Sequence, residues 1–157
     1  MNENLQIKNA ADLVTSREQT RAGFIEAAFA KNRKAQPYIE QAKTLKSLAS
    51  QAASPLELLD ISDIRNSLLT ASGLSDKSFK YFTKDDKTEA IKKMISEFLD
   101  PAGENFVDEL VYRFLLIKGD ALGGSMRNYV GSVAQMKLVR KILSILSMQQ
   151  IGFQILF

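Results

Sequence analysis

Hydrophobic residues recur every three or four positions along almost the whole chain, and this spacing places them on one face of an α-helix. The clearest run lies between Ala90 and Phe98. Thr83 and Asp86 precede it as the N-cap and N3 residues of a capping box, and Pro101 follows it and predicts an end near Leu99 or Asp100. The same reasoning predicts helices over about 17–30, 37–49, 83–100, 104–117 and 132–147. It also predicts a short helix from Pro55 that restarts at Ser62–Asp63 and ends before Gly73, and a brief turn near 75–82.

Two segments interrupt this helical pattern. Lys31–Gln36 is polar and basic, and Pro37 after it suits the first turn of a new helix. Lys118–Asn128 contains three glycines, which are typical of a turn, and we expect it to separate two helices. Gly73 is predicted to end a helix as its C′ residue.

The last seven residues differ from the rest. Ile151–Phe157 alternates and is rich in large apolar side chains, so it predicts a strand, although no second strand pattern is present to pair with it. We therefore expect an all-α, irregular domain of six to seven helices over residues 1–147. Residues 148–157 are expected to begin a second, truncated part, in a sequence that is the front part of something longer or a frame-shifted remnant of it.

Composition excludes several kinds of chemistry. The 157 residues include no Cys and no His. Disulfides, thiolate or imidazole metal sites, and Cys- or His-dependent nucleophilic catalysis are therefore excluded within this sequence. No run of about 18 apolar residues indicates a membrane span, and the polar start does not resemble a secretion signal. We expect a cytoplasmic protein.

The positive charge is concentrated near the end of the sequence. From Lys118 onward there are five basic residues against one acid, whereas the first 117 residues carry 16 basic and 17 acidic residues. A basic segment suits a polyanion such as nucleic acid, although a solvated basic face with no ligand is an equally simple interpretation.

The glycine-rich segment is the first candidate site. Lys118, Ser125, Arg127 and Asn128 are donors suited to phosphate oxygens. A nucleotide-binding P-loop is excluded because Ser125 stands where that loop needs its lysine. A plain turn with capping residues explains the same composition, so both interpretations stay open.

Two further basic clusters are candidates for contact with a DNA backbone. Arg33 lies in the first cluster, and Lys80 and Lys84 flank aromatic residues in the second. The triplet Asp85–Lys87 superficially resembles the acid-x-Lys element of a magnesium-dependent nuclease. It falls in the first turn of a capped helix, so we assign it to capping. The sequence predicts neither a catalytic residue nor a metal site.

Several long runs resemble the amino-terminal part of the AvaI/BsoBI-type type II restriction endonucleases. The runs are Arg21–Ile25, Leu69–Lys77, Asp86–Lys92, Phe106–Asp120 and Leu122–Asn128. The resemblance covers roughly Arg21 to Gln149.

The resemblance implies a helical amino-terminal region, here residues 1–147, that precedes an α/β nuclease core, with residues 148–157 as the truncated start of that core. Members of this family are expected to be homodimers that surround duplex DNA and cut within C-Y-C-G-R-G, using Mg²⁺ held by acids on strands of that core. No catalytic residue can be carried over to this sequence. The resemblance thus predicts a DNA-embracing scaffold without cleavage activity or a cofactor of its own. A self-contained all-α module that binds DNA or protein is the alternative.

Overall fold

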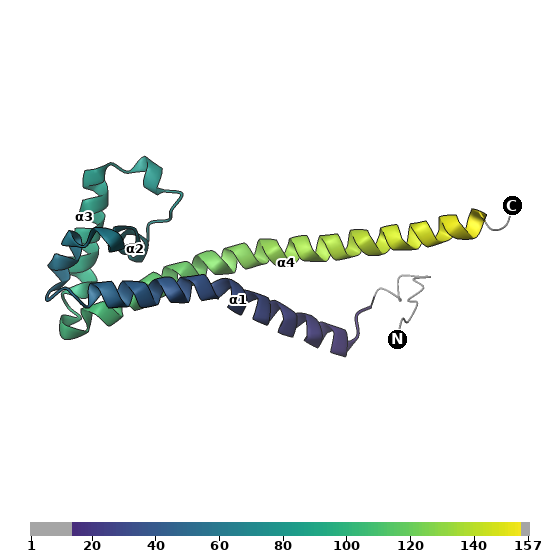
Figure 1. Cartoon of the computed structure of the whole chain (residues 1–157), viewed down its shortest axis with the longest axis horizontal. Helices are drawn as coiled ribbons and strands as arrows, with labels where there is room; N and C mark the ends of the chain where they lie inside the picture. Colours follow the sequence, from purple (N-terminus) through teal and green to yellow (C-terminus); the bar gives the residue numbers. More distant parts are fainter. Residues whose placement is uncertain (1–13, 155–157) are drawn as a thin grey trace. The chain divides into compact units, whose positions relative to one another are not determined.

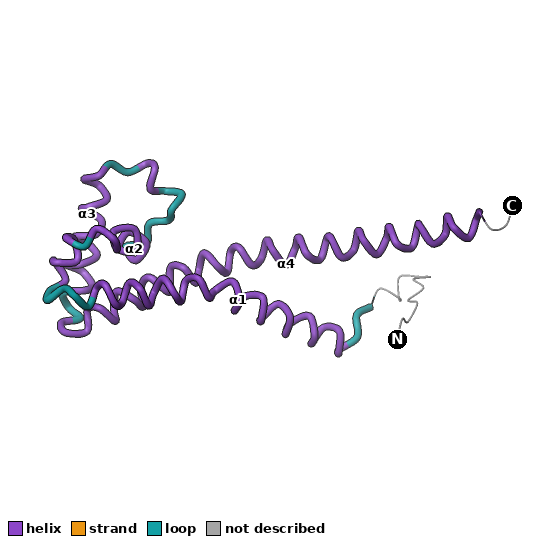
Figure 2. Tube along the Cα trace, in the orientation of Figure 1, coloured by secondary structure: helices purple, strands orange, loops and turns teal. Residues whose placement is uncertain are grey.

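The computed structural model describes the backbone of residues 14–154 and the side chains of residues 14–147. This part of the chain consists of helices and loops without any strand (Figure 2). The all-α prediction is thereby confirmed for it. The predicted six or seven helices are four α-helices joined by short 3₁₀ turns and one π-helical turn (Figure 1): α1 (Arg17–Ala49), α2 (Arg65–Ala71), α3 (Lys84–Met94) and α4 (Phe106–Gln154).

The chain divides into two compact units, residues 1–34 and 35–157. The described part of the first unit is mostly the amino-terminal portion of α1. The second unit contains the end of α1 and all the other helices. The predicted boundary at residue 147 stays a prediction.

The predicted break at Lys31–Gln36 is wrong, because α1 continues through it and contains Pro37 in its interior. Proline removes one backbone hydrogen bond and is unfavourable inside a helix. Side-chain links span the site: Gln36 donates to Glu40 over 2.7 Å, and Lys43 pairs with Glu40 over 3.0 Å. Helical residues on both sides of Pro37 maintain the helix, since extending an existing helix by one residue costs much less free energy than starting a new one.

The hydrophobic core lies in the second unit, where the end of α1 meets α2, α3 and the first turns of α4. Leu45, Leu68, Ile91 and Phe114 represent these four helices, and each is at most 1% exposed. Ile91 belongs to the apolar run Ala90–Phe98 that the sequence predicted to form one face of a helix. Polar contacts at the margin tie the same helices together, including the 2.6 Å hydrogen bond from Arg65 to Thr88.

Most of the predicted helix ends are confirmed. Thr83 and Asp86 form the capping box of α3. Gly73 has a φ of 89° after α2, and the two backbone bonds Gly73→Thr70 and Leu74→Leu69 form a Schellman motif. The helical turn before Pro101 ends at Leu99, and Ser16 and Gln19 exchange capping hydrogen bonds at the start of α1.

The predicted break at Lys118–Asn128 is also wrong, because α4 runs through it as one helix. Each glycine in a helix costs about 1 kcal/mol relative to alanine. Leu122 and Met126 are 6% and 7% exposed, so their burial offsets part of this cost. Neither Gly119 nor Gly123 is required by crowding, since a Cβ atom at either position would meet nothing within 4 Å.

The predicted strand at Ile151–Phe157 is wrong over residues 151–154, whose backbone is helical; residues 155–157 lie outside the described residues. A strand needs a neighbouring strand for its backbone hydrogen bonds, whereas a helix satisfies them within itself. Extending α4 therefore satisfies this backbone where no partner strand is present.

Two apolar stripes at helical spacing are exposed. The first is on α1, where Phe24 and Phe29 are 73% and 60% exposed. The second is on the carboxy-terminal part of α4, around Leu143. Helical periodicity identified both faces correctly, but it does not say what covers them.

Replacing Gly119 by alanine tests the continuity of α4. Because Gly119 is exposed within the helix and has free space around it, we expect Gly119→Ala to stabilise the protein by about 1 kcal/mol. Gly73→Ala is the matched control and is expected to destabilise, because its backbone is left-handed. Chemical unfolding followed by circular dichroism measures both changes. A destabilising Gly119→Ala would indicate a turn at this point.

Removing the Thr83 hydroxyl tests the cap of α3. Thr83→Ala is expected to destabilise by about 1 kcal/mol at neutral pH. Hydrogen bonds from the Thr83 hydroxyl and backbone N–H lower the pKa of Asp86 from its ordinary value of 3.8. A depressed carboxyl pKa stabilises the fold above the unfolded-state value, and this contribution is lost as pH falls through the folded-state value.

The difference between wild type and Thr83→Ala should therefore shrink below about pH 4. Unfolding titrations between pH 2 and 7 measure it. Thr44→Ala serves as control, because its hydroxyl bonds only to the Glu40 carbonyl within α1. A Thr83 effect that is independent of pH would contradict the assigned role of Asp86.

Candidate nucleic-acid interface

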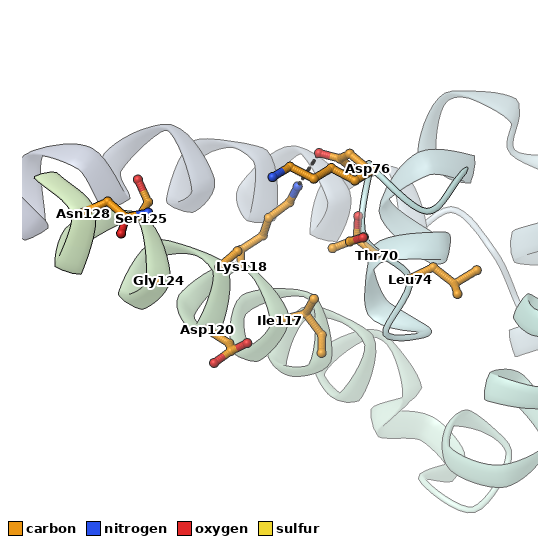
Figure 3. A pocket seen from close by; sticks show the side chains of 12 residues that line it. Thr70, Leu74, Asp76, Ile117, Lys118, Asp120, Gly124, Ser125 and Asn128 are labelled. Atoms are coloured by element: carbon orange, nitrogen blue, oxygen red, sulfur yellow. Dashed lines mark ion pairs between the residues drawn. The ribbon is translucent and has the colours of Figure 1, made fainter. Parts of the chain in front are cut away.

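A cavity of about 700 Å³ lies between the loop that follows α2 and one face of α4. It brings together three of the predicted site residues, Lys118, Ser125 and Asn128 (Figure 3). The loop contributes Asp76 and Lys77 to the opposite wall. Because α4 is continuous, these α4 residues line the cavity from successive turns of one helix rather than from a flexible loop.

Lys118 is the most enclosed charged group of this cavity. Its side chain is 16% exposed, and it reaches from α4 toward Asp76, with 3.6 Å between the ammonium and carboxylate groups (Figure 3). The ammonium nitrogen also lies 5.7 Å and 5.8 Å from the ring centres of Tyr38 and Phe114. Cation–π attraction and the ion pair together hold this cation in place.

The charges around the cavity are balanced. Lys77 and Lys118 face two carboxylates, Asp76 and Asp120. A phosphate that approached Lys118 would meet the carboxylate of Asp76, which is 73% exposed. The cavity is therefore better suited to mixed hydrogen bonding than to holding a free anion.

A second cavity of about 420 Å³ shares part of this lining. Thr70, Asp76 and Lys118 border both cavities. Lys118 thus lies at their junction.

The remaining predicted residues lie elsewhere. Arg127 is exposed on α4 but does not line the cavity. Lys80 belongs to the 3₁₀ turn Phe79–Tyr81, where its ammonium lies 4.9 Å from the Tyr81 ring centre, and Lys84 is the first residue of α3. Arg33 belongs to the other compact unit. All four stay predictions as DNA contacts.

The basic residues of α4 share one side of the helix. At 3.6 residues per turn, successive residues are rotated by about 100°. The basic residues of the segment then fall within about half of the circumference; they are Lys118, Arg127, Lys137, Arg140 and Lys141. We call this side the basic face of α4. Sequence reasoning did not find it, because a turn at 118–128 would have separated these residues.

Magnesium is the metal that the family resemblance implies, and the carboxylates described here do not fit it. The described residues contain no group of three or more possible ligands. Asp86 caps α3, Glu109 pairs with Arg113 over 2.7 Å, and Asp108 pairs with Lys46 over the same distance. The hydrogen bond to Asp108 raises the pKa of Lys46, as an ion pair within the fold should. These acids therefore have structural roles.

Comparison with known proteins decides the family. A sequence model of the family described as "Restriction endonuclease BsobI" matches residues 3–157. The chain belongs to the BsoBI restriction endonuclease family. It is 51% identical over 148 residues to the type II restriction enzyme BsoBI of Geobacillus stearothermophilus, and 50% identical over 148 residues to the type II restriction enzyme AvaI of Nostoc sp. and of Anabaena variabilis.

These alignments cover 94% of this chain but only 46% of BsoBI and 47% of AvaI. The chain thus spans about half the length of these members of the BsoBI family. The resemblance noted in the sequence is confirmed. No helix in the described part of this family member is long and apolar enough to cross a membrane.

Sequence reasoning missed Asp76 as a partner of the candidate site. Asp76 and Lys118 are far apart in the sequence and come together only because α2 packs on α4. No local signal could have found this pair. The low exposure of Lys118 could not have been foreseen either, since lysine is mostly found exposed on protein surfaces.

Proposed function

We propose that this chain is the helical part of a type II site-specific deoxyribonuclease that embraces and positions double-stranded DNA. The observation that carries the proposal is the family match over residues 3–157, with about half of the residues identical to enzymes named as type II restriction enzymes. The specificity for C-Y-C-G-R-G and the homodimer implied by the resemblance form part of the same proposal.

The basic face of α4 supports a role in binding DNA. Its exposed members, from Arg127 to Lys141, span about 21 Å of the helix at 1.5 Å per residue. Phosphate contacts by lysine and arginine position a protein on DNA and add affinity without reading its sequence. We assign this positioning role to the basic face, with Lys80, Lys84 and Arg33 as further candidates. Ser125 and Asn128 could add hydrogen bonds from the neighbouring cavity.

The hydrolytic residues are assigned to the half of the family enzymes that this chain does not match. Asp86 caps a helix and Asp108 and Glu109 form ion pairs, and the described residues contain no group of three possible metal ligands, which supports this division.

We expect the 157-residue chain alone, with Mg²⁺ and duplex DNA that contains C-Y-C-G-R-G, to show no cleavage. Gel electrophoresis measures the products, and complete BsoBI is the positive control. Specific cutting by the chain would contradict the assignment of hydrolysis to the unmatched half.

Arg127→Ala tests the basic face directly. If Arg127 neutralises one phosphate, the variant should bind duplex DNA more weakly and lower the slope of log K against log salt by about one unit. The loss should be similar for a duplex with and without the hexanucleotide. Fluorescence anisotropy between 50 and 300 mM salt measures these quantities.

Lys43→Ala is the control, because it removes an exposed cation of α1 that already pairs with Glu40. Its salt slope should equal that of the unmodified chain. An unchanged slope for Arg127→Ala would assign Arg127 a structural role, and salt-independent binding by the unmodified chain would refute the proposed function.

A further inference from the structure

The carboxy-terminal part of α4 carries an exposed apolar face. Six large hydrophobic side chains between residues 136 and 146 are each 47% to 58% exposed. They are Met136, Leu138, Val139, Ile142, Leu143 and Leu146. We call them the apolar face of α4. This much unpartnered apolar surface on one helix indicates an interaction site.

The apolar face lies opposite the basic face. At about 100° per residue, five of its six members occupy the half of the circumference that the basic residues leave free, and Met136 lies at the boundary, on the same side as Lys118. A shift of 18 residues is about five turns and returns to the same side of the helix. Gly124, Ser125 and Asn128 in the cavity wall therefore share a side with Ile142, Leu143 and Leu146. Along the length of α4, the side chains on this side thus change from small and polar to large and apolar.

A second copy of the chain is a poor occupant for this face. Between Tyr129 and Ser147 the helix carries three basic residues and no acid. Two such helices packed side by side would bring like charges together at the edges of the contact, which is unfavourable. The basic residues favour a partner with neutral or acidic margins.

A lipid surface is also a poor match. A helix that lies in a membrane interface needs its apolar side to stay apolar over its whole length. Here the same side continues into the cavity wall with Ser125, Asn128 and the neighbouring Asp76. A folded protein surface can match such a change from polar to apolar, whereas a bilayer cannot.

We propose that the apolar face of α4 is the docking surface for the nuclease half of the endonuclease, the part that the family enzymes possess outside the matched region. The relatives are about twice as long as this chain, so slightly more than half of each is available to cover the face. This inference rests on the proposed function and adds to it a division of α4: one side faces DNA and the other holds the nuclease half.

The test uses the full 157-residue chain and the unmatched half of BsoBI, produced in the same cells with an affinity tag on the BsoBI half. The two are expected to co-purify and to sediment as a one-to-one complex. Leu143→Glu should weaken this complex at least tenfold because it places a charge in the apolar contact. Ser144→Glu is the matched control, since it adds the same charge one residue away on the basic side. Circular dichroism should show equal helix content in both variants, because both positions are exposed.

A direct fusion of the chain to the same BsoBI half provides a second measurement that does not need the separate halves to associate. Hydrogen exchange at the amides of residues 136–146 should slow at least tenfold in the fusion relative to the isolated chain. Leu143→Glu should reverse this protection, and Ser144→Glu should not.

Four results would overturn the proposal. The first is that no complex forms and that the fusion shows no protection from hydrogen exchange. The second is that Leu143→Glu and Ser144→Glu weaken the complex equally. The third and fourth are that the chain alone dimerises, or binds anionic phospholipid vesicles, and that Leu143→Glu abolishes this association. None of these docking assays contains DNA. Failure of the docking proposal is therefore distinguishable from failure of the proposed function, because the proposed function is tested by the salt-dependent DNA binding of the isolated chain.

Discussion

The unbroken backbone hydrogen bonding of α4 is the constraint on which the other features depend. Because the helix runs from Phe106 to Gln154 without a turn, each of its residues has a defined angular position about one axis. The glycines of the 118–131 region are accommodated within it at a moderate cost. A break in this region would have scattered the basic residues and separated the cavity wall from the apolar face.

The beginning of α4 is held firmly, and this anchoring orients the residues that follow. Leu110 and Phe114 are almost fully buried among the end of α1, α2 and α3. Arg113 adds a stacking contact, with its guanidinium carbon 3.6 Å from the centre of the Phe98 ring, and an ion pair with Glu109. The candidate site begins one turn further on, at Lys118, so the core directly positions its most enclosed cation.

The two sides of α4 explain how one helix can serve both proposed contacts. Charged side chains lie on one side, while apolar side chains on the other gain free energy only when a partner removes them from water. The members of the BsoBI family to which the chain is similar are about twice as long as the chain. Such an arrangement suits a scaffold that lies between a nucleic acid and a second protein domain.

Sequence reasoning correctly predicted the elements whose causes are local. The capping box at Thr83, the left-handed Gly73 and the buried face around Ile91 each depend on residues within a few positions of one another. The same reasoning gave the helical class and the family resemblance, and it selected Lys118, Ser125 and Asn128, which prove to share a cavity.

Only the tertiary structure decided whether helix-breaking residues end a helix. Pro37 and the glycines after Lys118 predict breaks when considered alone, yet the helices that contain them continue, because cooperative hydrogen bonding outweighs a few unfavourable residues. Ile151 began a predicted strand, but it is helical because no neighbouring strand is present in the described chain. The pairing of Lys118 with Asp76 likewise needed the packing of α2 on α4. Amino-acid order determined which faces are apolar or charged, and the fold determined which of them were buried, because burial requires a partner in space that local sequence does not specify.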